Sequence, residues 1–286
     1  MKISIITITF QCEKYIDRCY YSILAQTFDD WEWVVVDDGS IDNTRKKLEE
    51  IKDERIKYFY LNPNQGRGRA RNFALDKVSG DWCVILDMDD LMDPIRLQCV
   101  IEADIEGYDY LLSSTRLIDD SFNTTGIRGI FYNQKLRIFT HATLCIKTKI
   151  LKAIRYSESR YAEDQRVILL ATTNNNGKFL NLPLYIYHEN ASLNLRSAIL
   201  SNLAAFKSLI DILFIEKSRK VEISILVYTF SFACKYLMLN VFRFFPSLYK
   251  LSYSFRSRTV NTNDHHPDGE AFMLELKKTF FSLNEL

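Results

Sequence analysis

The sequence is poor in the features that mark several classes of protein. Its six cysteines form no C-x-x-C pair, and a chain of 286 residues needs no covalent staples, so we predict reduced, packed thiols in a cytoplasmic protein. The net charge of +1 argues against nucleic-acid binding by the whole chain. The apolar run at 3–10 lacks the length and cleavage site of a secretory signal, so a buried strand explains it better.

Long hydrophobic runs are also missing. Between Glu222 and Lys235 lie twelve uncharged residues, whereas a membrane-spanning helix needs about 20. Residues 195–260 hold ten Lys or Arg and three Asp or Glu, beside many aromatic residues. Two interpretations stay open. These helices pack on the rest of the chain or on a second copy in a homo-oligomer, or they lie on an anionic surface at the inner face of the cell membrane. We expect residues 261–270 to form an exposed loop.

The first half of the chain alternates strand and helix signals. Apolar, β-branched runs predict buried parallel strands, and amphipathic segments between them predict helices. We expect strands at 3–10, 31–36, 56–61 and 82–86, and helices at 15–25, 43–51, 69–78 and from Pro94. This order predicts an α/β fold with a mostly parallel sheet between helices.

The second half gives weaker signals, and they suggest a domain division. Strands are expected near 108–117, 143–146 and 179–187, with a helix from about 163. We assign residues 1–194 to one α/β domain with halves 1–107 and 108–194. Residues 195–286 form a helical, basic and apolar C-terminal region in this division.

Polar clusters follow the predicted strands, at the sheet edge where ligands bind in such folds. Asp87 and Asp89 alternate, so their carboxylates face one side and suit Mn²⁺ or Mg²⁺. The alternative is a capping cluster ahead of Pro94. Asp38 can accept hydrogen bonds from a base or a ribose, although Asp-Gly is also a turn dipeptide.

Basic and acidic groups elsewhere complete the candidate chemistry. Arg67, Arg69 and Arg71 open a predicted helix and suggest a diphosphate site, with a solvated basic face as the alternative. Asp164 at another helix start could act as general base or simply favour the helix dipole. His188 follows a strand and is a metal-ligand candidate, although a lone histidine is more often structural.

Taken together, these motifs resemble the family 2 glycosyltransferases of the GT-A fold, the large bacterial group that builds surface polysaccharides. The matching segments occur in family order and at family spacing: 5–10, 22–28, 33–40, 64–66 with 70–72, 86–90 and 163–164. The resemblance implies a Rossmann-like GT-A domain whose halves 1–107 and 108–194 bind the nucleotide and the acceptor.

The resemblance also implies roles for single residues. Thr7, Thr9 and Asp38 would hold the nucleoside, and Arg71 would lie near the nucleotide or its diphosphate. Asp87 and Met88 would contact the donor. Asp89 would bind the metal, with His188 as a third ligand. Asp164 would be the catalytic base.

The activity implied is a single displacement with inversion, from a nucleoside-diphosphate sugar, UDP above all, to an acceptor hydroxyl. The acceptor would be a glycan or lipid-linked glycan in capsule, O-antigen or lipopolysaccharide synthesis. No Trp follows Trp82, so the Gln-x-x-Arg-Trp of membrane-embedded processive synthases is absent. Around His188 the family's second Ser is replaced by Asn194 at a longer spacing.

Two other functions compete with this one. A sugar nucleotidyltransferase would share the sheet, but it usually has a Gly-rich phosphate loop after the first strand, and residues 10–13 contain no Gly. An inactive homologue acting as a scaffold is the second alternative. The intact Asp87, Asp89 and Asp164 argue against it.

Overall fold

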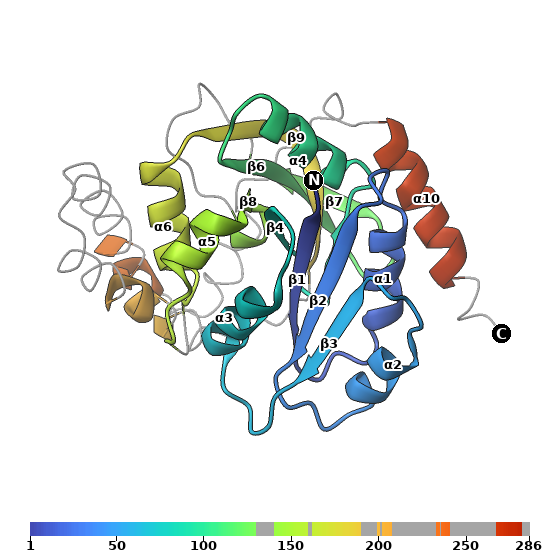
Figure 1. Ribbon diagram of the computed structural model, residues 1–286, viewed down its shortest axis with the longest axis horizontal. Coiled ribbons are helices and arrows are strands. Elements are labelled where there is room, and N and C mark those ends of the chain that lie inside the picture. The colour runs from blue at the N-terminus through green and yellow to red at the C-terminus, as the bar shows by residue number, and fades with distance from the viewer. Residues whose placement is uncertain are drawn as a thin grey trace.

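One mixed β-sheet with helices on both faces organises the protein (Figure 1). The computed structural model describes residues 1–129, 140–159, 162–189, 199–200, 202–207, 233–234, 236–240 and 267–281. Nine strands form the sheet, in the order β3-β2-β1-β4-β8-β6-β9-β5, and β7 pairs with β6.

The N-terminal half is parallel, as the sequence predicts. Its elements are β1 (Ile3–Thr9), α1 (Ile16–Leu24), β2 (Trp31–Asp37), α2 (Thr44–Glu50), β3 (Ile56–Tyr60), α3 (Arg67–Lys77) and β4 (Trp82–Ile85). β1 lies between β2 and β4, and all three strands run the same way. Their carboxyl ends therefore meet at one edge, where parallel sheets bind ligands.

The second half mixes strand directions. It contains β5 (Leu91–Met92), α4 (Arg96–Ile105), β6 (Tyr110–Ile118), β7 (Thr124–Arg128), η1 (His141–Thr143), β8 (Cys145–Lys147), α5 (Thr148–Ile154), α6 (Gln165–Asn174) and β9 (Gly177–His188). β8 runs antiparallel to β4 and β6, and β5 runs antiparallel to β9, whereas β6 and β9 are parallel. The sheet thus adds antiparallel strands to the parallel half.

The sheet buries apolar side chains on both faces. Trp33 and Trp82 lie fully buried in the core beneath α1 and α4. The opposite face packs Ile6 and Val36 against α3, α5 and α6, through residues such as Leu75. Figure 1 shows α3, α5 and α6 on one side of the sheet and α1, α2 and α10 (Pro267–Phe281) on the other.

Two sequence expectations need correction. The helix expected from Pro94 begins at Arg96, because Ile95 is its cap residue. The expectation of an exposed loop over 261–270 is wrong from residue 267 onward, because α10 starts there and Gly269 is buried. A Cβ atom at Gly269 would lie 2.4 Å from Asp93 Oδ2, so an added side chain would force the Asp93 carboxylate to move. Residues 261–266 lie outside the described part.

Helix α10 packs on the strand that directly follows the Asp87–Asp90 segment. Its Phe272, Met273 and Leu276 are buried against Leu91 of β5 and against Ile118, Phe122 and Ile186. Arg116 Nη1 pairs with Glu270 Oε1 at 2.6 Å, and the Tyr21 hydroxyl donates to Glu275 at 2.6 Å. The end of the chain thus stabilises the sheet edge beside the candidate site.

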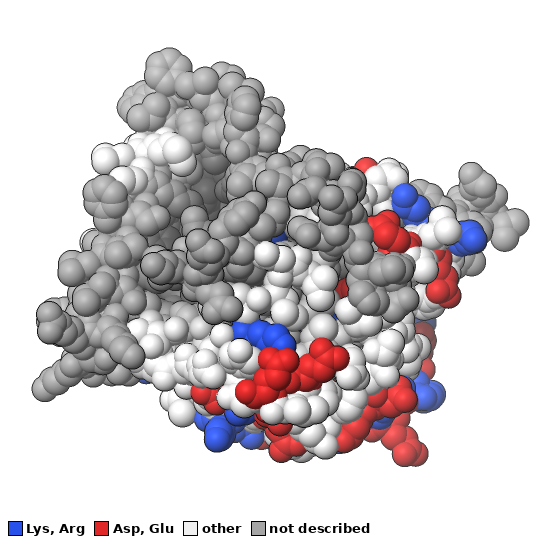
Figure 2. All heavy atoms as spheres, turned by 90° about the horizontal axis from the view of Figure 1, so that it is seen from above, with Lys and Arg blue, Asp and Glu red and all other residues white. Residues whose placement is uncertain are grey.

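Cys19, Cys83, Cys99 and Cys145 are buried, as expected of packed thiols, whereas Cys12 is half-buried and Cys234 is exposed. Among the described helices, none combines the length and the apolar character needed to cross a membrane. Most of the basic segment 195–260 lies outside the described residues, so its two interpretations stay open. On the face shown in Figure 2, the described acidic and basic side chains are interspersed.

Replacing Phe272 with Ala should lower the free energy of unfolding by roughly 3–5 kcal/mol, because the ring is buried against β5 and β9. Leu274→Ala is the matched control, since Leu274 lies on the same helix but is 56% exposed. We expect it to change stability by about 0.5 kcal/mol or less. Urea unfolding measures both. Equal losses would show that α10 does not pack as described.

Candidate active site

The segment after β4 places alternating side chains on opposite sides. Met88 is buried in the core, whereas the Asp87 side chain is 39% exposed. Burial and the neighbouring Asp87 raise the pKa of Asp89. The next acid, Asp90, is buried, and it accepts hydrogen bonds from the Tyr185 hydroxyl and from the His188 main-chain N–H. Asp90 therefore anchors this turn to β9, whereas Asp87 pairs with Arg71.

Arg71 connects this segment with the acids at the start of α6. Its guanidinium is buried, and it pairs with Glu163 through Nη1 and with Asp87 Oδ1 through Nη2 at 3.3 Å. The guanidinium carbon also lies 5.4 Å from the ring centre of Tyr156. One rigid cation thus neutralises two carboxylates that come from different parts of the chain.

The two acids at the start of α6 have different surroundings. Glu163 is buried against Arg71, whereas Asp164, the cap residue of α6, makes no side-chain capping bond. Burial and the adjacent Glu163 raise the pKa of Asp164, and Arg71 partly opposes this. A carboxylate with a raised pKa at a cavity wall is suited to accept a proton from a substrate.

These groups line one cavity of about 330 Å³. Its walls are formed by Arg67, Arg71, Asp87, Thr140, His141, Ala142, Ala162, Glu163, Asp164, Gln165, Asn202 and Ala205. The structure therefore brings together three of the predicted site residues, Arg71, Asp87 and Asp164. A cation, an exposed carboxylate and a proton acceptor in one cavity suit transfer chemistry on an anionic substrate.

Asp38 lies at the end of β2 and fixes the loop that leads into α3. Its two carboxylate oxygens accept the main-chain N–H groups of Gln65 and Gly66, each at 2.8 Å. Its neighbour Asp37 accepts from the Ser40 hydroxyl at 2.6 Å. Asp38 does not line the cavity, so its role with the nucleoside stays a prediction.

Thr7 and Thr9 are buried at the end of β1. The Thr7 hydroxyl accepts the indole N–H of Trp33 at 2.8 Å, on the core side beneath α1. Neither threonine lines the cavity. A contact with the nucleoside therefore stays a prediction for both.

His188 lies at the end of β9, with its ring beside Asp120. Its Nε2 is 3.0 Å from Asp120 Oδ1, and burial lowers its pKa. Among the residues that the structure describes, no group of three or more His, Cys, Asp or Glu could hold a metal ion. A role for His188 as third metal ligand therefore stays a prediction.

Some cavity residues have no motif that sequence reasoning could have used. His141 hydrogen-bonds the Tyr156 hydroxyl at 2.9 Å, and Asn202 lies beyond the predicted boundary at 194. Among the three arginines of α3, Arg67 lines the cavity, whereas Arg69 pairs with the exposed Glu158 at 2.9 Å. The alternating arginines thus separate into cavity and surface groups, which spacing alone could not show.

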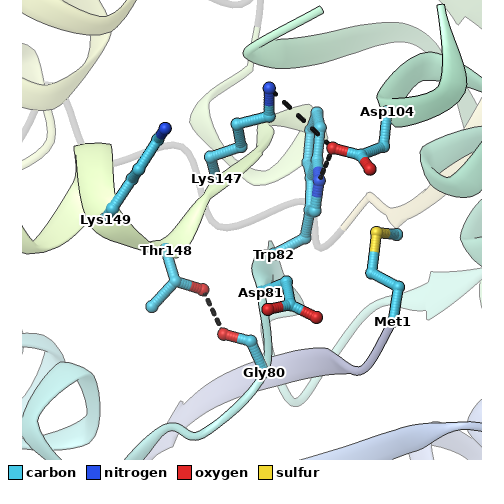
Figure 3. A pocket seen from close by; sticks show the side chains of 8 residues that line it. All are labelled: Met1, Gly80, Asp81, Trp82, Asp104, Lys147, Thr148 and Lys149. Carbon is cyan, nitrogen blue, oxygen red and sulfur yellow. Dashed lines mark hydrogen bonds and ion pairs between the residues drawn. The ribbon is translucent and has the colours of Figure 1, made fainter. Parts of the chain in front are cut away.

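A second hollow, of about 540 Å³, lies at the opposite, amino-terminal end of β1 and β4 (Figure 3). Two of its charged side chains are already paired, because Lys147 lies 3.2 Å from Asp109 and 3.8 Å from Asp104. Asp104 also accepts the Trp82 indole N–H at 2.9 Å. Despite its larger volume, this hollow is at the wrong end of the parallel strands for the predicted chemistry.

The sequence and the fold agree on one class of enzyme. The profile of the family described as "Glycosyl transferase family 2" matches residues 4–157. The chain belongs to this family, and its structure has the GT-A fold that the sequence predicts.

Known glycosyltransferases are similar to this chain in sequence. A putative teichuronic acid biosynthesis glycosyltransferase, TuaG of Bacillus subtilis, is 37% identical over 102 residues, 35% of this chain and 40% of that protein. The Escherichia coli UDP-Glc:alpha-D-GlcNAc-diphosphoundecaprenol beta-1,3-glucosyltransferase WfgD is 39% identical over 99 residues, 35% of this chain and 39% of that protein. This chain thus spans about two fifths of the length of these relatives.

A solved structure of Staphylococcus aureus TarS, residues 1–349, in complex with UDP-GlcNAc shares the fold. It superposes with a TM-score of 0.64 at 23% identity, covering 81% of this chain and 73% of TarS 1–349. At this identity the likeness concerns the fold alone.

Arg71→Met should lower the free energy of unfolding by about 3–5 kcal/mol, because it leaves Glu163 and Asp87 without their cation. The control is Arg69→Met on the same helix, which breaks an exposed pair worth about 1 kcal/mol or less. Denaturant unfolding distinguishes the two. A small loss for Arg71→Met, matching that of Arg69→Met, would contradict the buried bridge.

Proposed function

We propose that this chain is an inverting glycosyltransferase that moves a sugar from a nucleoside-diphosphate donor, UDP above all, to an acceptor hydroxyl in surface glycan synthesis. One observation carries the proposal: Arg71, Asp87 and Asp164 line a single cavity. The donor would place its sugar between Asp87 and Asp164. Thr7, Thr9 and Asp38 would complete the donor site, and Met88 would contribute through its main chain, because its side chain is buried in the core.

Asp164 is the proposed general base. Its carboxylate removes the proton of the acceptor hydroxyl as that oxygen attacks the anomeric carbon from the side opposite to the diphosphate. Glu163 is unsuited to this task because its carboxylate is engaged by Arg71. The departing diphosphate carries negative charge, and Arg67 on the cavity wall favours an anion, whereas Arg71 already pairs with Glu163 and Asp87.

A divalent cation, Mn²⁺ or Mg²⁺, fits the acids after β4. Burial raises the pKa of both Asp89 and Asp90, and the charge of Asp87 adds to this, so a bound cation would stabilise the ionised carboxylates there. Such ions commonly take one or two carboxylates and complete their shell with substrate phosphates. We assign Asp89 as ligand, with His188 as a further candidate. Such a metal would stabilise the charge of the leaving diphosphate.

The relatives support the choice of substrates. WfgD is named for a UDP-Glc donor and a diphosphoundecaprenol-linked acceptor, TuaG for teichuronic acid biosynthesis, and TarS is solved with UDP-GlcNAc. We therefore propose a lipid-linked or polymeric glycan acceptor and a cytoplasmic site of action. Contact of residues 195–260 with the inner face of the membrane, and a homo-oligomer, remain proposals.

The competing functions are less well supported. A sugar nucleotidyltransferase is disfavoured because the family match covers residues 4–157. A scaffold without activity would not need Asp164 kept at the cavity with a raised pKa. Glycosyl transfer gives a role to Arg67, Asp87 and Asp164 among the charged groups that line the cavity.

Purified protein with Mn²⁺ should release UDP from at least one donor in a panel of UDP-sugars. Asp164→Asn should lower the rate of transfer to the acceptor by about 10²–10⁴-fold, because the amide cannot accept a proton. Asp89→Asn should raise the Mn²⁺ concentration needed for activity. Lys149→Met, in the remote hollow of Figure 3, is the control and should leave the rate unchanged. Full activity of both acid variants would contradict the mechanism.

The dependence of kcat/KM on pH should show the raised pKa of Asp164. The base acts only when deprotonated, so activity rises as pH increases through its pKa. Burial and Glu163 raise that pKa, so the acidic limb should lie above the value of about 3.9 for an ordinary Asp. Initial rates over a pH series measure the limb, with circular dichroism as a control for folding. A limb at or below the ordinary value would argue against Asp164.

A further inference from the structure

Glu163 is a buried acid that the proposed mechanism does not use. We propose that Glu163 is a positioning residue that acts through Arg71 to hold the start of α6, and with it Asp164, at a fixed place relative to Asp87. This inference rests on the proposed function, because it assigns Asp164 as the base. It goes further by giving the first acid of the pair a separate task.

The contacts of Arg71 support this task. Its two terminal nitrogens bind different partners, with Nη1 on Glu163 and Nη2 on Asp87. A planar guanidinium has its donors in a fixed fork, so the two carboxylates cannot shift independently. Arg71 therefore sets the spacing between the end of β4 and the start of α6. The donor side and the base side of the cavity are held by one group.

Close packing limits other arrangements of the same parts. A Cβ atom at Gly68 would lie 2.0 Å from the Ser157 carbonyl oxygen, so α3 presses directly on the segment before α6. Asn72 holds that segment by donating to the Tyr156 carbonyl at 3.0 Å, and the Ser157 N–H donates to the Glu163 carbonyl at 3.1 Å. The Glu163 backbone and side chain are thus both fixed to the α3 side of the cavity.

The charge of Glu163 also acts on Asp164 directly. The charged and titratable groups that act on Asp164 are Glu163 beside it, Arg71 from α3 and Tyr156 from the segment after α5. Further groups lining the same cavity are Asp87, Arg67 and His141. Glu163 raises the pKa of Asp164, whereas Arg71 lowers it. A neutral residue at 163 should therefore let Asp164 lose its proton at lower pH.

Two substitutions separate charge from position. Glu163→Gln keeps the length of the side chain and removes its charge, so the acidic limb of kcat/KM should move to lower pH with about a tenfold loss in rate. Glu163→Asp keeps the charge but is one methylene too short for Arg71. It should keep the wild-type limb and lose about 10²-fold in kcat/KM, the scale of a 1 Å misplacement.

A role in folding alone gives a different result, because both variants would then lose stability while their acidic limbs stayed at the wild-type pH. Carboxyl ¹³C NMR titration measures the pKa of Asp164 without requiring turnover, and the Asp164→Asn variant assigns the signal. If the wild-type protein released no UDP from any donor, the proposed function would be wrong. The NMR titration of Asp164 would still test this inference. Wild-type kcat/KM in Glu163→Asp overturns it, because the shortened side chain would then hold Asp164 as well as glutamate does.

Discussion

The buried bridge between Asp87, Arg71 and Glu163 is the interaction on which the catalytic end depends. Two carboxylates this close to the core are tolerated because one guanidinium lies between them. Each of the three groups belongs to a different part of the fold, namely the end of β4, helix α3 and the turn before α6. The bridge forms only when the parallel half of the sheet and the second half are both in place.

The bridge also divides the charge of the site into two regions. On one side, Asp89 has a raised pKa because it is buried beside Asp87, and this region suits a cation. On the other side, Asp164 has a raised pKa because it is buried beside Glu163, and this region suits the acceptance of a proton from the substrate. A donor with an anionic leaving group and an acceptor with a hydroxyl need both regions, and Asp87 connects them because it lines the same cavity as Asp164.

Much of the fold could be predicted, because buried parallel strands have nearly continuous apolar sequences. β1, β2 and β4 were found within one or two residues. The sequence did not predict β5, β7, η1 or α5, and it did not predict the start of α10 at Pro267, which lies in a polar stretch. The packing of the apolar face of α10 depends on its partners on the sheet, and a single sequence does not show those partners.

The site was predictable in its residues and less so in its contacts. Motif order indicated Asp87, Arg71 and Asp164, and all three line the cavity. The pairing of Arg71 with Glu163 depends on how α6 begins, and the contribution of Asn202 depends on how the chain returns to the cavity. Neither has a local pattern, because both arise from tertiary packing.

A crystal structure with UDP and Mn²⁺ tests the central claim most directly. The account predicts anomalous density for Mn²⁺ at Asp89 and a diphosphate in the cavity beside Arg71, with Asp164 facing the space for the sugar. Nucleotide bound in the hollow of Lys147 and Lys149 at the opposite end of the sheet, with the Arg71 cavity empty, would contradict it.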